Sequence, residues 1–369
     1  MNVLMVTPHL PPHQAANALL PHLLGRALAG DGHAVRYLAF GREADHPDTA
    51  FVRRRMRRLR ATRLPQAIEA AETWWKARPL VESADVLHIH SSTWMNQVAA
   101  RLAVRRRRPY VLTHYGTEIW HHDGRDARFR RFNRDAAHVT FYSAALLLRA
   151  RELDVPLPAA SVVYPPVADE FHPPSPEARE AVRRQHLPRG GALLLNVKRL
   201  HPLADQATLL EAMARVRARR EDVTLLIAGE GPLESELKGR ARDLGLGDVV
   251  RFLGAVPNER VAALQGAADL FALSSALEAT PTVALEALAC ATPVVSTDNP
   301  GGLELSGIFG EDVAVVPRRD PASLARAILA FLDSPRRARP ETARIVAERF
   351  RLPGVVARYL ALYREAAAR

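Results

Sequence analysis

Residues 274–295 read SSALEATPTVALEALACATPVV and lie between two short apolar runs, each typical of a buried strand. Thr280 and Pro281 favour a helix start in this stretch. Thr accepts a backbone N–H at the N-cap, and Pro fits the first helical position. The pattern therefore predicts a strand, a loop, a helix over 282–291 and a second strand.

The start of this predicted helix is a candidate anion site. The unpaired N–H groups of Thr282 and Val283, together with the helix dipole, favour a negative charge there. Glu286 follows Thr282 by four residues and shares its face one turn deeper, while Glu278 lies in the preceding loop. This arrangement suits a ligand with phosphates and hydroxyls, such as a nucleotide sugar. Two solvated glutamates beside an ordinary turn are the plainer alternative.

The composition is that of a soluble globular protein. The chain has 369 residues, 48% of them hydrophobic and 25% charged, which is enough for two domains. No apolar run approaches the ~20 residues of a membrane span. The N-terminus lacks the basic region of a signal peptide, and the single Cys290 allows no internal disulfide. We therefore expect a cytoplasmic protein.

The formal net charge of +11 is concentrated in two arginine-rich runs, 53–63 and 105–108. A solvated face is the first interpretation of such runs. Peripheral contact with an anionic membrane surface, at the inner face of the membrane, is the second. Nucleic acid ranks last and is not expected as a partner, because no aromatic residues interleave with the arginines and no nucleic-acid motif accompanies them.

Strand and helix patterns alternate along both halves of the chain, which predicts an α/β fold with two parallel sheets. We expect an N-terminal domain over 1–170, a Pro-rich linker over 171–189 and a C-terminal domain over 190–340. The amphipathic helices of 341–369 are expected to pack back towards the N-terminal domain. The crevice between the domains is the expected ligand site.

Four sequence features point to one family. They are HLPPHQAAN at 9–17, THYGTE at 113–118, VVYPPVADEFHP at 162–173, and the run from KRLHPLADQATLLEA through AGEGPLESEL to ALEATPTVALEALACATPVVSTDNPGG. In this set, Glu278 and Glu286 form an E-x7-E element. The chain resembles the retaining GT-B glycosyltransferases of the GT4 type over nearly its whole length.

The resemblance implies a GT-B fold, in which two Rossmann-like domains face each other across a cleft. It also implies transfer of a sugar, hexosyl or related, from a nucleotide diphosphate-sugar to an acceptor hydroxyl with retention of configuration. The acceptor would be a glycan, a glycolipid or a small molecule. The front-face mechanism proposed for this class needs no dedicated base, since a donor phosphate oxygen takes the proton. No Asp-x-Asp motif is present, so neither a divalent metal nor another cofactor is expected.

The resemblance also assigns donor-side roles. Glu286 would bind the ribose hydroxyls, and Glu278 the hydroxyls of the donor sugar. Arg199 would stabilise the departing diphosphate. The remaining donor-side candidates are Pro281, with the backbone N–H groups of Thr282 and Val283 at the diphosphate, and Val256, in the segment 252–258 along the nucleotide base.

On the acceptor side, the resemblance places His114 and Glu118 near the reacting sugar. The acceptor is expected against this domain, with Gln14 and Ala15 in the first loop. Two rival functions remain. One is a degenerate GT-B protein that binds a nucleotide sugar or a partner without efficient transfer. The other is a nucleotide-sugar 2-epimerase of the same architecture, which the E-x7-E element disfavours.

The chain departs from the family pattern at several positions. Ala204 and Asp205 stand where a phosphate-binding Lys and a Gly are usual. We hypothesise that Lys198, which stands where the family commonly has Gly, partly replaces the lost charge and binds the donor. The segment 14–16 reads Gln-Ala-Ala in place of a Gly pair. Tyr115 separates His114 from Gly116.

Overall fold

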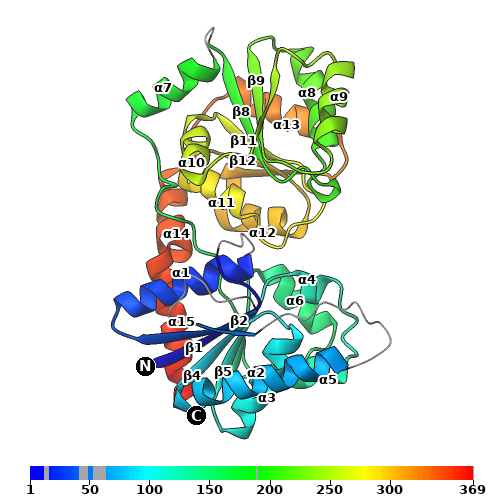
Figure 1. Cartoon of the computed structure of the whole chain (residues 1–369). Coiled ribbons are helices and arrows are strands. Elements are labelled where there is room, and N and C mark those ends of the chain that lie inside the picture. The colour runs from blue at the N-terminus through cyan, green and yellow to red at the C-terminus, as the bar shows by residue number, and fades with distance from the viewer. Residues whose placement is uncertain (12–15, 41–48, 53–63, 188–189, 369) are drawn as a thin grey trace. The chain divides into compact units, whose positions relative to one another are not determined.

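The computed structural model describes residues 1–11, 16–40, 49–52, 64–187 and 190–368. The chain divides into two compact units (Figure 1). The first unit consists of Met1–Pro166 with Leu352–Arg369, and the second of Val167–Arg351. The cleft expected between two domains stays a prediction.

The first unit is built on a seven-stranded parallel sheet in the order β3-β2-β1-β4-β5-β6-β7. Apolar runs such as VLHIH and YVLTH are buried along their whole length, as expected for central strands covered on both faces. The strands are β1 Asn2–Thr7, β2 Ala34–Phe40, β3 Thr49–Val52, β4 Val86–His90, β5 Tyr110–His114, β6 His138–Phe141 and β7 Ala160–Val162.

Helices cover both faces of this sheet. Helices α1 and α15 pack together on one face, and α2, α3 and α5 lie on the other (Figure 1). Side-chain caps start several of them; Ser143, for example, accepts the N–H of Leu146 at the start of α6. The helices are α1 Ala16–Gly30, α2 Leu64–Ser83, α3 Trp94–Arg105, α4 Thr117–Trp120, α5 Ala127–Arg134, α6 Ala144–Glu152 and α15 Leu352–Ala367.

The second unit has a six-stranded parallel sheet in the order β10-β9-β8-β11-β12-β13. One face packs on α8, α9 and α13, whose leucines, alanines and isoleucine share a core with alternate strand residues. Helices α10, α11 and α12 contact the sheet strands on the other face. The strands are β8 Ala192–Val197, β9 Val223–Ala228, β10 Val250–Gly254, β11 Leu270–Leu273, β12 Val294–Thr297 and β13 Val313–Val316.

The helical segments of this unit include two short 3-10 turns, η1 Pro202–Ala204 and η2 Gly310–Asp312. The helices are α7 Pro176–His186, α8 Gln206–Arg217, α9 Glu234–Asp243, α10 Asn258–Ala267, α11 Thr282–Ala289, α12 Pro300–Phe309, α13 Pro321–Asp333 and α14 Pro340–Phe350. The two parallel sheets confirm the predicted α/β fold class.

The sequence did not predict α7 and α12, although both carry start signals. Ser175 caps α7 and Asn299 caps α12, and a proline follows each cap. Proline density in one case and a Gly pair in the other hid the helical pattern. Helix α7 occupies much of the segment expected to be a linker and packs on α10.

The C-terminal helices are divided between the units. Helix α14 lies in the second unit, where it contacts α11, while α15 lies in the first unit against β4 and β5. His88 contacts α15, and His90 lies beside it on the same face of β4. Their rings lie 3.9 Å apart, and His88 Nδ1 is 2.6 Å from the Tyr363 hydroxyl. The two histidines of β4 therefore pack side by side on one face of the strand.

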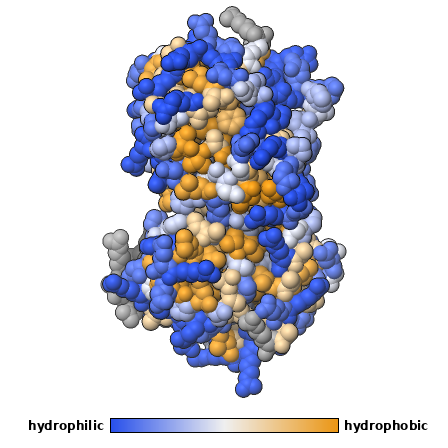
Figure 2. All heavy atoms as spheres, turned by 180° about the vertical axis from the view of Figure 1, so that it is seen from behind, coloured by the Kyte–Doolittle hydropathy of each residue, from blue (hydrophilic) through white to orange (hydrophobic). Residues whose placement is uncertain are grey.

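Apolar side chains supply the buried core of both units, and Cys290 is buried among them as a small core residue. Hydrophilic residues cover much of the face in Figure 2, with smaller apolar areas between them. Among the residues that the structure describes, no helix combines the length and the hydropathy needed to cross a bilayer.

Candidate functional site

The strand order of the second unit locates its ligand edge. From β8 the sheet grows through β9 and β10 in one direction, and from β11 through β12 and β13 in the other. Open parallel sheets bind ligands outside the carboxyl ends of the strands, at the point where the order reverses. Residues 198–199 follow β8 and residues 274–281 follow β11. Four of the predicted donor-side residues therefore stand at this switch point: Lys198, Arg199, Glu278 and Pro281.

An ion pair joins the two sides of the switch point. Lys198 Nζ lies 2.5 Å from Glu278 Oε1, and both side chains are half-buried. The pair brings together a residue after β8 and one after β11, two segments eighty positions apart in the sequence. Sequence reasoning placed each residue at the site but did not foresee their contact.

Arg199 differs from its neighbour Lys198. Its side chain is exposed, and within the described part of the chain its guanidinium has no ion-pair or hydrogen-bond partner. The backbone is fixed, because the Arg199 carbonyl accepts a hydrogen bond from Gln206 Nε2 at 3.3 Å. Arg199 thus presents an uncommitted cation at the ligand edge.

The glycine-containing turn after β9 holds the chain that carries these two cations. A Cβ at Gly229, where φ is 133°, would lie 2.2 Å from the Lys198 carbonyl oxygen, and one at Gly231 would lie 2.2 Å from that of Leu200. Leu200 in turn donates its N–H to the Glu230 carbonyl at 3.0 Å. Only glycine permits this close approach, which fixes the backbone beneath Lys198 and Arg199.

Helix α11 begins at Thr282, as predicted, but the expected cap is wrong. The N-cap residue is Pro281, with φ −75° and ψ 89°, and no side chain of the described residues caps the helix. The Pro281 carbonyl instead accepts from the N–H groups of Ala284 and Leu285. Among the described residues nothing accepts the N–H groups of Thr282 and Val283, so two donors remain for an anion.

Glu286 lies one turn further along α11 and is half-buried. Burial, reinforced by the nearby charge of Glu170, raises its pKa from 4.5 to about 7. A hydrogen bond from Gln265 and the charge of Lys198 act in the opposite direction. The carboxyl is therefore ready to change its protonation state near neutral pH when a ligand binds.

Gly301, at the start of α12, contacts the loop that carries Glu278. Its N–H donates to the Glu278 carbonyl at 3.0 Å, and a Cβ there would lie 2.7 Å from Pro281 Cδ. The start of α12 is thereby packed directly on the loop that carries Glu278. The sequence motif had included Gly301 without showing what it contacts.

The departure at positions 204–205 has a clear local structure. Ala204 is buried in η1, and its carbonyl accepts a hydrogen bond from the Ser274 hydroxyl at 2.9 Å. Asp205 adopts the left-handed backbone, with φ 47° and ψ 44°, at the position where the family has glycine. The turn is thus retained, while the cation expected at position 204 is absent.

The segment predicted to lie along a nucleotide base follows β10. Val256 is half-buried there. The preceding residue, Ala255, donates its N–H to Glu230 Oε1 at 3.3 Å, which ties this segment to the turn after β9. Val256 thus belongs to the same edge of the second unit as Lys198 and Arg199.

In the first unit, the predicted sugar contact His114 is fully buried. Asn133 Nδ2 donates to the Phe129 carbonyl, so its Oδ1 accepts from His114 Nε2–H at 2.8 Å. The ring of His114 also packs against Phe129 and Phe141. His114 thus supports the end of β5, and its contact with a sugar stays a prediction.

Glu118 likewise supports the turn after β5. Its Oε1 accepts the Tyr115 N–H at 3.0 Å and lies 3.5 Å from His114 Nδ1. Burial raises the pKa of Glu118, but hydrogen bonding and charge from His114 outweigh it and hold that pKa below its usual value. The side chain is committed to the fold and is only partly exposed.

Sequence reasoning named Tyr115 as a departure from the family pattern but missed its contacts and those of several other residues at the two sheet edges. Gln265 bridges the Val283 carbonyl and the Glu286 carboxyl, and no motif marks it. In the first unit, the Tyr115 hydroxyl lies 2.6 Å from His90 Nδ1, and its ring packs on Tyr142 at 4.5 Å. The positions of His90, Tyr115 and Tyr142 could have marked them as residues of this edge, because each lies at or directly after the carboxyl end of a strand.

Some predictions fall outside the described residues. Gln14 and Ala15 do so, as does the arginine run 53–63. In the second run, Arg106 pairs with Glu82 at 2.8 Å and Arg105 stacks over Trp74, so much of it is anchored on α2. No group of His, Cys, Asp and Glu suited to a metal occurs within the described ranges.

Two family profiles match the chain in succession. One is described as "Glycosyl transferase 4-like domain" and matches residues 21–167; the other, "Glycosyl transferases group 1", matches residues 178–348. A GDP-mannose-dependent alpha-(1-6)-phosphatidylinositol monomannoside mannosyltransferase of Mycobacterium tuberculosis is 30% identical over 325 residues, which is 82% of each chain. The chain belongs to the group 1 glycosyl transferase family, with a GT4-type N-terminal domain.

A D-inositol 3-phosphate glycosyltransferase 2 of Catenulispora acidiphila is 39% identical over 189 residues, covering 48% of this chain and 43% of that protein. The chain thus spans about half the length of some curated relatives that it matches. The fold of this group 1 chain is similar to that of Anabaena Alr3699/HepE in complex with UDP, with a TM-score of 0.80, 20% identity, and 98% and 99% of the two chains covered. This likeness confirms the GT-B fold.

Proposed function

We propose that the chain transfers a hexosyl residue from a nucleoside diphosphate-sugar to an acceptor hydroxyl, with retention and without a metal. One observation carries the proposal: the Lys198–Glu278 ion pair, the uncommitted Arg199 and the free N–H groups of α11 meet at the switch point of the second sheet. Membership of the glycosyl transferase family supports the same activity.

The chemistry of a nucleoside diphosphate-sugar suits these groups. The N–H groups of Thr282 and Val283 would hold the diphosphate, and Arg199 would stabilise the charge that grows on it as the glycosidic bond breaks. Glu286 would accept the ribose hydroxyls, and the segment around Val256 would lie along the base. Lys198 would hold Glu278 in place for the sugar hydroxyls and add a positive charge near the diphosphate.

For the transfer step, we propose that a phosphate oxygen of the donor takes the acceptor proton. Among the described residues at this edge, the cation that is free to touch the leaving group is Arg199. Positioning and charge stabilisation would then supply most of the rate enhancement. His114 would act through the Tyr115–Gly116 turn that it supports.

The relatives suggest a substrate class. Their names specify GDP-mannose as donor, or inositol phosphate and phosphatidylinositol mannoside as acceptor, and the structural neighbour was crystallised with UDP. We propose a GDP- or UDP-hexose as donor and a hydroxyl of a polyol phosphate or glycolipid as acceptor. Action in the cytoplasm, with peripheral contact to an anionic membrane, is part of this proposal.

A thermal-shift screen with UDP, GDP, ADP, TDP and CDP tests the donor side, because binding to the native state raises the melting temperature. The matching nucleotide sugars are then incubated with inositol phosphate or phosphatidylinositol acceptors, with and without EDTA. The proposal predicts release of nucleoside diphosphate, an α-linked product by NMR from an α-linked donor, and equal rates with EDTA. Inverted product or loss of rate in EDTA contradicts it.

Ala204 favours a second candidate, a binding protein without efficient transfer. The position that usually carries a phosphate-binding cation holds a buried methyl group. If this candidate is correct, one nucleotide sugar will raise the melting temperature while no acceptor in the panel promotes release of nucleoside diphosphate. A sugar epimerised at C2 and still linked to the nucleotide would indicate the 2-epimerase instead.

A further inference from the structure

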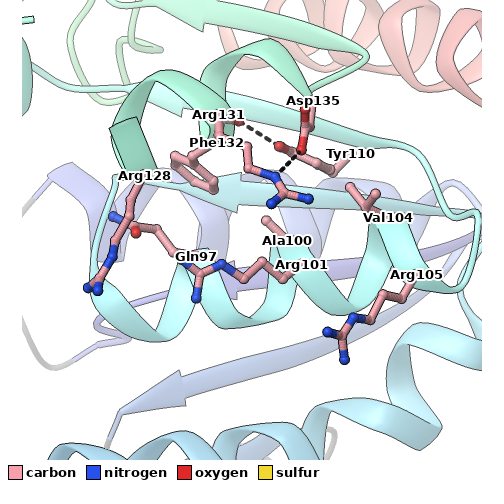
Figure 3. Close-up of a pocket in the computed structure, with 10 residues that line it drawn as sticks. All are labelled: Gln97, Ala100, Arg101, Val104, Arg105, Tyr110, Arg128, Arg131, Phe132 and Asp135. Atoms are coloured by element: carbon pink, nitrogen blue, oxygen red, sulfur yellow. Dashed lines mark hydrogen bonds and ion pairs between the residues drawn. The ribbon is translucent and has the colours of Figure 1, made fainter. Parts of the chain in front are cut away.

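A group of arginines lies on the first unit, away from the carboxyl edge of its sheet. Helices α3 and α5 enclose a pocket of about 100 Å³ (Figure 3). Arg101 and Arg105 reach it from α3, and Arg128 and Arg131 from α5. Tyr110, the first residue of β5, also lines it, whereas the ligand edge lies at the other end of that strand, beyond His114.

The positive charges in this pocket are poorly neutralised. Among the described residues that line it, the single carboxylate is Asp135. It lies 3.2 Å from Arg131 Nε and 3.4 Å from Arg134 Nε, so two arginines share it. Arg105 stacks over the Trp74 ring at 5.2 Å. Within the part of the chain that the structure describes, the guanidinium groups of Arg101 and Arg128 have no acidic partner.

Arg101 of α3 lies across the pocket from Arg128 and Arg131 of α5, whereas Arg105 points away from them (Figure 3). Figure 3 shows Arg101 extending from α3 towards the side occupied by Arg128 of α5, with Arg131 above them. Arg105 and Arg131 lie in the last turns of their helices, where the helix dipole offers partial negative charge. Arg128 lies in the first turn of α5, where the dipole adds positive charge instead. The Tyr110 hydroxyl is already used, since it donates to the Phe132 carbonyl at 2.5 Å. The pocket therefore lacks the negative charge that would neutralise its arginines.

We propose that this pocket, the arginine pocket, binds a phosphate-bearing anion. Guanidinium groups match phosphate with paired N–H···O bonds, and Arg101 with Arg128 offers two such forks from opposite walls. The phosphate belongs either to a soluble phosphate ester or to a lipid headgroup. The site is separate from the donor edge of the second unit, and the proposal does not rest on the proposed function.

The test uses the full chain and two probes, inorganic phosphate and vesicles of phosphatidylglycerol with phosphatidylcholine. The variant is Arg101→Gln/Arg128→Gln. The matched control is Arg151→Gln/Arg219→Gln, which removes the same charge from two exposed arginines outside the pocket. Arg199→Gln serves as a second control for phosphate bound at the donor edge.

We expect the pocket variant to lose at least about tenfold in phosphate affinity, relative to the matched control, because two charge-assisted contacts are removed. If it also loses vesicle binding, the phosphate belongs to a lipid headgroup; if vesicle binding is equal, it belongs to a soluble ester. Equal phosphate affinity in the pocket variant and its control overturns the proposal, as does a loss confined to Arg199→Gln. Circular dichroism establishes that each variant is folded.

Discussion

The carboxyl edges of the two sheets use their polar groups in opposite ways. In the second unit, the Arg199 guanidinium and the first N–H groups of α11 have no partner among the described residues. In the first unit, His114 bonds Asn133, Glu118 bonds the Tyr115 N–H, and the Tyr115 hydroxyl lies against His90. The named groups of the second edge are open to a ligand, whereas those of the first edge are paired within the protein. At the first edge, the buried His90 Nε2 and His114 Nδ1 also lack a hydrogen-bond partner among the described residues.

This contrast shows that two sheets of similar topology can use the polar groups at their carboxyl edges differently. Both sheets reverse their strand order near the middle, and each places polar residues at the reversal. Unsatisfied donors and cations are costly unless a ligand or water meets them, so the second unit is the natural holder of a charged donor. Substitutions at the edge of the second sheet should therefore reduce turnover or ligand affinity, whereas substitutions at the edge of the first sheet should reduce stability.

The largest effect is expected at Arg199. Arg199→Ala removes the uncommitted cation at the place where the leaving diphosphate gains charge, so kcat should fall about 100- to 1,000-fold. Melting temperature should change little, because the guanidinium has no protein partner within the described residues. Steady-state kinetics with the best donor measure this. A fall below threefold would show that the two edges do not differ as described.

Lys198→Ala should weaken donor affinity by about tenfold. The substitution removes a positive charge and leaves Glu278 without its partner at 2.5 Å, so the carboxylate repels the diphosphate. Titration calorimetry with the nucleotide sugar measures this. Lys238→Ala, an exposed lysine on α9 that pairs with Glu234, is the control. Equal affinities in the two variants would refute the idea that Lys198 replaces the missing cation.

Asn133→Ala in the first unit should reduce stability and leave nucleotide affinity unchanged. The substitution leaves the buried Nε2–H of His114 unpaired, which should lower the free energy of unfolding by about 1–3 kcal/mol. Urea denaturation measures the stability, and nucleotide titration measures the affinity. A large affinity loss in folded protein would mean that the first edge also binds the nucleotide.

The smallest effect is a pH dependence at Glu286. Ribose hydroxyls donate to a carboxylate, and the pKa of about 7 means that this form prevails only above neutrality. Affinity for the nucleotide sugar, whose diphosphate does not titrate in this range, should therefore rise severalfold from pH 6 to pH 8 in the native protein and stay level in Glu286→Gln. An affinity that does not change with pH in the native protein would contradict the assignment of Glu286 to the ribose hydroxyls.

The same raised pKa has a consequence for stability. The native state holds this proton more tightly than the unfolded chain does. Glu286 therefore contributes stability that is fully present below about pH 4.5 and is lost as the pH rises through about 7. Urea denaturation of Glu286→Gln should not show this contribution.

Much of the second unit could be predicted from its sequence, because its site is local. Residues 278–286 carry a loop, a helix start and two carboxylates within nine positions, and apolar runs mark the flanking strands. The Lys198–Glu278 pair could not be predicted, since it depends on β8 and β11 being neighbours. The cap at Thr280 was predicted wrongly because Pro281 takes that position itself.

The first unit was harder to predict for a physical reason. His114 stands in a motif that suggests a ligand contact, but alternation along β5 turns its ring towards Phe129 and Asn133. A sequence pattern shows which face of a strand a side chain occupies only when one face is hydrophobic and the other is polar. Here both faces of β5 are buried, so the pattern gave no direction.

The central claim is that the second unit grips the nucleotide beside the start of α11. The most direct measurement is calorimetric titration at pH 8 with the nucleoside diphosphate that gives the largest thermal shift. Native protein is compared with Glu286→Ala and with Glu236→Ala, an exposed glutamate on α9 in the same unit. The account predicts at least about tenfold weaker binding in Glu286→Ala alone. Unchanged affinity in folded Glu286→Ala would contradict it.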